Sequence, residues 1–149
     1  MPRVIHFDIP SNNPERLADF YRRLFGWEIQ NWGLVEYWLA TTGPDSEPGI
    51  NGAIARRDPR EGTRNTISVK SADETLREIG EAGGKALSEK MAVPGVGYHA
   101  LCEDPEGNVF GIMELDPTAK WTPEEEEMVR KGRRQKPPDP AGPPGSGPG

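Results

Sequence analysis

Apolar and polar residues alternate near the start of the chain, which predicts a β-strand with two different faces. One face carries Ile5, Phe7 and Ile9, and the other carries Val4, His6 and Asp8. An apolar face suits packing under a helix, whereas an imidazole and a carboxylate are costly in a core that gives them no partners. We therefore expect His6 and Asp8 to lie on an open side of the sheet.

The spacing of apolar residues then changes to that of an amphipathic helix. The residues that share its inner face are Leu17, Phe20, Tyr21 and Leu24. Asn13 is the expected N-cap, and Gly26 is the expected end of the helix. Three short strands are predicted after it, at residues 27–30, 35–41 and 49–56. The order of elements is βαβββ.

A second stretch of the chain repeats this order. Residues 66–70 alternate as a strand, and a capping box at residues 71–74 opens a helix that ends at Gly83. Three further strands are predicted at residues 85–88, 96–103 and 109–115. A module of about fifty residues is too small to bury its own sheet face well, so the two copies should fold together.

These patterns predict an α+β domain over residues 1–116, built from paired βαβββ modules that form a cupped mixed sheet. The open faces of the modules would enclose a cleft lined by polar side chains such as His6, Arg64 and Thr66. Residues 117–135 are expected to form a short charged helical extension. Residues 136–149 are rich in Pro and Gly, and we expect a disordered tail there.

Charge and composition narrow the class of protein. Eighteen basic residues against 24 acidic residues give a net charge of -6, which disfavours binding to nucleic acid or to an anionic membrane. No apolar run is long enough to span a bilayer, and the start of the chain lacks the apolar run of a secretory signal. With a single cysteine, Cys102, no internal disulfide can form. We expect a cytoplasmic protein.

Three tracts of the sequence resemble one known superfamily. They are VIHFDIP at residues 4–10, FYRRLFGW at residues 20–27 and DPEGNVFG at residues 104–111. Together they resemble the vicinal oxygen chelate superfamily, which includes glyoxalase I, bleomycin and fosfomycin resistance proteins, extradiol dioxygenases and methylmalonyl-CoA epimerase. The most similar branch is the glyoxalase-like group related to lactoylglutathione lyase. The resemblance implies the paired βαβββ fold, a homodimer and a divalent metal in the cup.

The metal ligands that this resemblance implies do not carry over. His6 matches the ligand of the first strand, but the next ligand position falls on residues 64–66, another on Gly111 and another near residues 52–53. Three or four protein ligands are needed to hold a first-row metal, so we predict no complete metal site and no cofactor. The alternative is a divalent-metal-dependent lyase, isomerase or dioxygenase. In that case the ligands are misaligned by one residue, and His99 or Glu114 joins His6.

The favoured prediction is a protein that binds a small organic molecule in the cleft between its modules. The predicted ligand contacts are His6, Tyr37, Trp38, Arg64 and Thr66. Tyr37 and Trp38 fall on opposite faces of one strand, so at least one of them should leave the core. His6 and Asp8 are the candidate catalytic pair, because a carboxylate on the same face can orient an imidazole or share its proton. Whether the chain is an enzyme stays open.

Cys102 and His99 are assigned structural roles. Cys102 has no histidine near it in sequence and no helix start beside it, so it is predicted to be a small buried apolar residue rather than a nucleophile. His99 lies on a predicted strand without other candidate groups, and we expect it to be hydrogen-bonded in the core.

Overall fold

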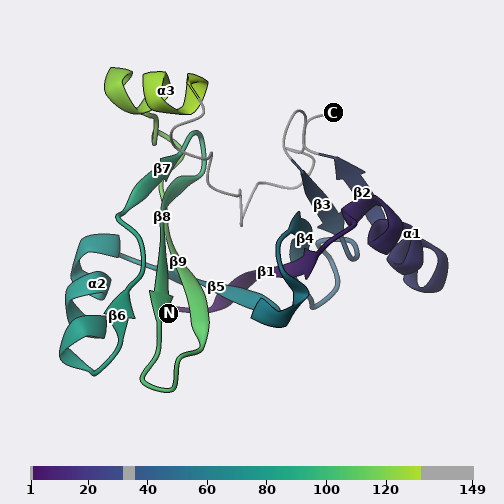
Figure 1. The fold of residues 1–149 in the computed structure, drawn as a ribbon, viewed down its shortest axis with the longest axis horizontal. Helices are drawn as coiled ribbons and strands as arrows, with labels where there is room; N and C mark the ends of the chain where they lie inside the picture. Colours follow the sequence, from purple (N-terminus) through teal and green to yellow (C-terminus); the bar gives the residue numbers. More distant parts are fainter. Residues whose placement is uncertain (1, 32–35, 132–149) are drawn as a thin grey trace. The chain divides into compact units, whose positions relative to one another are not determined.

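The computed structural model describes residues 2–31 and 36–131 (Figure 1). Within these ranges lie nine strands and three α-helices, and the chain divides into two units. The N-terminal unit comprises residues 4–66, and the C-terminal unit comprises the described residues before 4 and after 66. Strand β5 (Arg64–Val69) begins in the first unit and ends in the second. Residue 35, where a strand was predicted to start, and the predicted tail at residues 136–149 lie outside the described residues.

The N-terminal unit follows the predicted order strand, helix, three strands. Its elements are β1 (Val4–Ser11), α1 (Pro14–Phe25), β2 (Glu28–Asn31), β3 (Tyr37–Thr41), β4 (Asn51–Arg56) and the 3-10 helix η1 (Pro59–Glu61). The strands are arranged in the order β2, β3, β4, β1. β1 and β4 are parallel, whereas β3 is antiparallel to both β2 and β4, so this is a mixed sheet.

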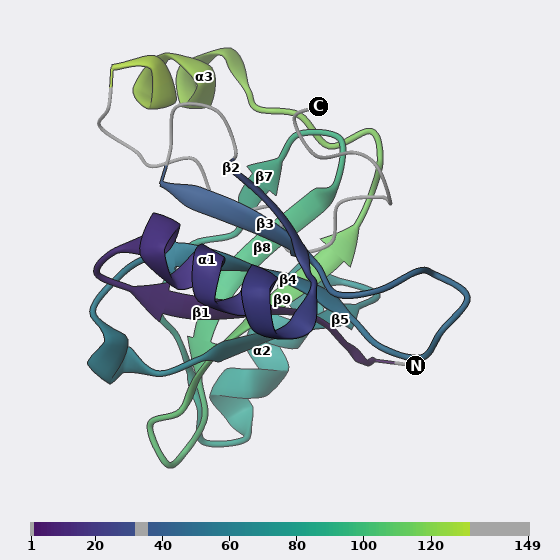
Figure 2. The same ribbon diagram turned by 90° about the vertical axis from the view of Figure 1, so that its right-hand side faces the viewer.

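Helix α1 forms where its capping signals predict it. The side chain of Asn13 accepts a hydrogen bond from the backbone N–H of Arg16 at 3.2 Å, and Gly26 ends the helix with φ 70°. The helix lies across the strands of the unit (Figure 2) and packs on β1, β3 and β4. The fully buried residues of this core are Ala18, Ile29, Ala40 and Ile54. Burial of a side chain the size of isoleucine stabilises the fold by about 1.5–3 kcal/mol.

Close packing between β1 and β4 depends on a glycine. Phe7 and Gly52 are register partners in the parallel pair. A Cβ atom built on Gly52 would stand 2.5 Å from Cδ2 of the Phe7 ring, well inside van der Waals contact. Gly52 therefore leaves room for the Phe7 side chain to lie over the neighbouring strand.

The C-terminal unit repeats the module with one additional strand. It contains α2 (Ala72–Glu81), β6 (Lys85–Ala86), β7 (Met91–Val93), β8 (Gly97–Glu103), β9 (Val109–Leu115) and α3 (Pro123–Arg130). β8 pairs with β9, β6 and β7, always antiparallel. The prediction did not include β7, because three residues are too few to show a period. α2 packs on β6, β8 and β9 around the buried residues Ala72, Ala100, Cys102 and Ile112.

The segment that follows β9 packs on the C-terminal unit before α3 begins. The Trp121 indole N–H donates to the Ala92 carbonyl at 2.9 Å, and the Ala119 carbonyl accepts from the Gly95 N–H at 2.9 Å. Ala119 is only 3% exposed. By contrast, none of the residues of α3 is buried. The predicted charged extension therefore begins with a packed segment and continues as a solvated helix through Arg130.

The predicted fold class is confirmed: the chain is an α+β protein with two related modules, of which the second has one strand more than βαβββ. Among the residues that the structure describes, no helix combines the length and apolar character needed to cross a membrane.

Candidate functional site

The two faces of β1 meet different surroundings, as the alternation predicts. Ile9 packs against the cluster beneath α1. His6 and Asp8 point to the other face, but this face is not open around them as predicted, because they are only 3% and 6% exposed. A buried imidazole and a buried carboxylate need partners. Both find one in Tyr37, which β3 supplies on the same face.

The three side chains meet through three atoms. Nε2 of His6 lies 3.2 Å from Oδ1 of Asp8 and 3.0 Å from the hydroxyl oxygen of Tyr37. The Tyr37 hydroxyl donates to the same Asp8 oxygen at 3.0 Å. A hydrogen on Nε2 gives the imidazole a donor toward Asp8, which leaves Nδ1 as its acceptor nitrogen. The carboxylate thus orients the ring, and the tyrosine fixes the carboxylate.

The electrostatic balance keeps Asp8 ionised. Burial raises the pKa of Asp8, but the hydrogen bond and electrostatic attraction of His6, the hydrogen bond from Tyr37 and the positive charge of Arg57 outweigh it. The pKa therefore lies below its ordinary value of 3.8. A charged Asp8 favours the His6 tautomer with a hydrogen on Nε2. The pair therefore has the arrangement of a general base supported by a carboxylate.

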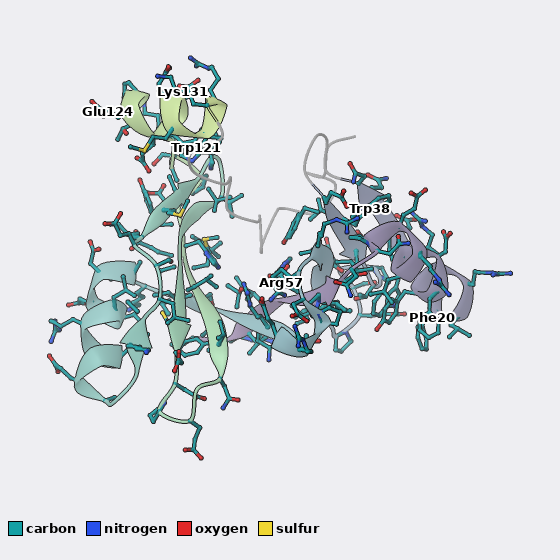
Figure 3. The ribbon with its side chains drawn as sticks, in the orientation of Figure 1. Phe20, Trp38, Arg57, Trp121, Glu124 and Lys131 are labelled. Carbon is teal, nitrogen blue, oxygen red and sulfur yellow. The ribbon has the colours of Figure 1, made fainter. Side chains whose placement is uncertain are left out.

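Two arginines lie on the connection from β4 to β5, and the charge of one of them, Arg57, acts on Asp8. Arg57 directly follows β4, and Arg64 is the first residue of β5. Both guanidinium groups donate to the same oxygen of Glu61, at 3.2 Å and 2.9 Å. Nη2 of Arg57 and Nε of Arg64 are buried and have no hydrogen-bond partner. In Figure 3 the Arg57 side chain lies away from α1, the helix that carries Phe20.

Sequence reasoning identified Arg64 but missed Arg57. The sequence signal that could have indicated Arg57 was the concentration of four arginines within residues 56–64. Period-two alternation cannot place Arg57, because it lies beyond the end of its strand. Thr66, also predicted as a contact, is 2% exposed and lies two residues after Arg64 on β5, so the two share a face.

The structure does not bring Trp38 to this group. Trp38 is the register partner of Ile54 and packs with the cluster beneath α1. The Arg22 guanidinium carbon lies 6.0 Å from the centroid of its ring. Of the adjacent pair, Tyr37 therefore faces the polar group and Trp38 faces the helix.

The donor set does not fit a divalent metal. Among the described residues, no three His, Cys, Asp or Glu side chains gather closely enough to hold one. The positive charge of Arg57 acts on Asp8, which opposes a cation there. In the alternative prediction, His99 or Glu114 completes the site. His99 pairs with Met113 and Glu114 pairs with Tyr98, so His99 and Glu114 lie on opposite faces of the β8–β9 pair. Glu114 accepts a hydrogen bond from the Ala72 N–H at 2.8 Å.

Known proteins are similar to this chain in sequence, and others are similar to it in fold. A family model described as Glyoxalase-like domain matches residues 4–113. A glyoxylase-like domain-containing protein of Didymella fabae is 30% identical over 117 residues, which cover 74% of this chain and 91% of that protein. CFP32 of Mycobacterium tuberculosis, described provisionally as a glyoxylase, is 26% identical over 126 residues. That match covers 76% of this chain but spans only 44% of CFP32.

Among solved structures, methylmalonyl-CoA epimerase from Mycobacterium tuberculosis has a similar fold. The TM-score is 0.56 at 14% sequence identity, and the match covers 76% of this chain and 88% of that chain. At this identity the likeness concerns the fold.

Proposed function

Because this chain belongs to the family of glyoxalase-like domains, within the vicinal oxygen chelate superfamily, we propose that it binds a small organic molecule on the side of β1 opposite α1, without a metal ion. The observation that carries the proposal is the buried group of His6, Asp8 and Tyr37 on the face of β1 opposite α1. Burial of such polar groups in an apolar core costs free energy, whereas ligand sites contain a few oriented polar groups among apolar side chains.

Each residue has a role in this proposal. His6 and Tyr37 contact the ligand, with Thr66 and Arg64 beside them on β5. Asp8 holds the imidazole, so that Nδ1 can accept a hydrogen bond or a proton from the ligand. A carbonyl compound suits these groups, because the C–H beside its carbonyl can give up a proton to Nδ1 of His6.

The test is ligand-detected NMR on the full chain with a panel of small aldehydes, ketones and organic acids. We expect compounds that bind to lose at least tenfold in affinity in His6→Gln and Tyr37→Phe. Trp38→Phe is the matched control, because Trp38 faces α1, and its affinity should not change. The proposal is wrong if no compound in the panel binds, or if the His6 and Tyr37 variants bind as the parent does.

Proton transfer is tested separately, in D2O. If the His6–Asp8 pair moves a proton, the C–H adjacent to the carbonyl of a bound compound exchanges with solvent deuterium, and this exchange is lost in His6→Gln. Binding without exchange would make the chain a binding protein rather than an enzyme.

Metal analysis of the purified protein tests the metal-free part of the proposal. We expect ligand affinity to be the same before and after treatment with EDTA. A stoichiometric metal that is lost in His6→Ala would instead establish the metal-dependent alternative.

The proposal includes a homodimer located in the cytoplasm. The prediction that Phe20 and Leu24 face the core was wrong: with Phe25 they are 50%, 61% and 61% exposed on the outer side of α1. These exposed apolar side chains support a dimer. A single buried cysteine, Cys102, suits a reducing compartment. Light scattering across a concentration series tests the dimer, and a single mass equal to one chain at all concentrations would contradict it.

A further inference from the structure

We infer that Arg57 and Arg64 form an oxyanion subsite that receives the carboxylate of a small organic acid. This inference rests on the proposed function, because it assigns the charged end of the ligand bound beside His6. The observation behind it is that Nη2 of Arg57 and Nε of Arg64 are both buried and both lack a hydrogen-bond partner among the residues that the structure describes.

Unpaired buried donors of this kind point to an absent acceptor. Buried N–H groups in folded proteins almost always have a partner, and a donor on a charged group is especially costly to leave unpaired. Here two such donors occur on two guanidinium groups that already share one carboxylate oxygen of Glu61. Two further acceptor oxygens would satisfy both groups, and a carboxylate supplies them.

The charges agree with this assignment. Burial and repulsion by the neighbouring positive charge of Arg64 both lower the pKa of Arg57. Glu61 offsets part of that repulsion. Asp8 attracts Arg57, but its Oδ1 is occupied by His6 and Tyr37. A bound anion would relieve the remaining repulsion.

Backbone contacts hold the two arginines in place. The backbone N–H of Arg57 donates to the Ser11 carbonyl at the end of β1, at 3.1 Å. The loop between the arginines closes through η1, and Gly62 leaves η1 with φ 78°, a conformation that glycine adopts readily. Arg64 then starts β5. The arginine side chains are 16% and 18% exposed, so they are largely withdrawn from solvent.

Arg60, on the same loop, provides the contrast. Its side chain is 91% exposed and pairs with Asp58 at 2.6 Å. It carries the same charge within a few residues of the subsite but no buried donor. Arg60→Gln is therefore the matched control for Arg57→Gln and Arg64→Gln.

The ligand class follows from the two groups together. The carboxylate would meet Arg57 and Arg64, and a hydroxyl or C–H group near it would face the acceptor nitrogen Nδ1 of His6. A small 2-oxo or 2-hydroxy acid combines these features. Inorganic phosphate shares the oxyanion chemistry but offers no second group to His6.

The experiment is an NMR titration of the full chain, observing the arginine Nε–Hε resonances. The probes are pyruvate, lactate, acetate, inorganic phosphate and the uncharged pyruvamide. We expect pyruvate or lactate to shift the Arg57 and Arg64 resonances, and pyruvamide to bind at least tenfold more weakly. Arg57→Gln and Arg64→Gln should each weaken binding of the acid at least tenfold, and Arg60→Gln should leave it unchanged. Thermal unfolding confirms that each variant is folded. If Arg57→Gln does not fold, Arg57→Lys replaces it, because lysine keeps the positive charge but lacks the guanidinium donors.

The outcomes separate this inference from the proposed function. One outcome overturns the subsite and leaves the proposed function standing. In that outcome pyruvamide binds as tightly as pyruvate, and its affinity falls in Tyr37→Phe but not in the arginine variants. Phosphate that binds more tightly than every acid overturns the assignment to an organic carboxylate. If none of the five probes shifts either arginine resonance, the inference is wrong.

Discussion

The Tyr37 hydroxyl donates to Oδ1 of Asp8 at 3.0 Å, although 29 positions separate the two residues in the chain. Tyr37 lies on β3 and Asp8 on β1, with β4 between them. The register partners on β4 are Ala55 for Tyr37 and Ala53 for Asp8. These small residues let the tyrosine side chain pass over the middle strand. The hydrogen bond therefore depends on three strands.

Replacement of Tyr37 by phenylalanine removes this hydroxyl and leaves the ring. Asp8 and His6 then lose a hydrogen-bond partner inside a buried site, so we expect the free energy of unfolding to fall by about 1–3 kcal/mol. Urea denaturation measures the change. Tyr21→Phe is the control, because Tyr21 contributes a ring that stacks on Trp27 at 4.8 Å. Equal effects of the two variants would contradict the prediction.

Replacement of Asp8 by asparagine should change the dependence of stability on pH. The pKa of Asp8 in the folded chain is below 3.8, so the ionised carboxylate contributes stability above about pH 4 that is lost as pH falls through the folded pKa. The parent should therefore exceed Asp8→Asn in stability near pH 6, and the difference should shrink toward about pH 3. Urea denaturation at a series of pH values checks this. A difference that stays constant over the series would contradict it.

Replacement of Gly52 by alanine should strain the contact between β1 and β4. The new methyl group would stand 2.5 Å from Cδ2 of Phe7, so the ring or a strand must move. We expect a loss of about 1–3 kcal/mol, as for other overpacked cores. Gly43→Ala is the control, since a Cβ atom there meets only the end of the Glu47 side chain, at 3.8 Å. Thermal unfolding of both variants gives the comparison.

Cys102 should react slowly with thiol reagents while the chain is folded. Its side chain is fully buried, and burial raises the pKa of the thiol to about 11, so little thiolate is present at neutral pH. Mass spectrometry after treatment with iodoacetamide should show an unmodified chain. The same treatment in urea should add one label. Rapid labelling of the folded chain would falsify the burial of this residue.

The sequence predicted the strand faces and helix ends that depend on local periodicity and on capping residues. Alternation in β1 separated Ile9 from His6 and Asp8, and the caps located α1. The choice between Tyr37 and Trp38 was not available, because it depends on which face of β3 receives the helix. Arg57 was missed for a similar reason: its environment is made by a loop that folds back toward Ser11, and no periodicity extends into that loop.

Short and backbone-mediated contacts were also beyond sequence reasoning. β7 is only three residues long. The segment before α3 is fixed by carbonyl and amide groups around Ala92 and Gly95, and such groups occur in every sequence. The side chains around Ala119 give no pattern that distinguishes a packed segment from a solvated one.

The alternation of β1 has a consequence for how such a protein can diverge. Positions 6 and 8 can be exchanged for other side chains while positions 7 and 9 continue to support the helix, so new ligand chemistry need not disturb packing. A deletion of one residue would have the opposite effect. Every later side chain of the strand would then swap sides, which would expose the apolar set and force the ionisable set beneath α1. Substitution, rather than change of length, is the route by which this strand can acquire a new specificity.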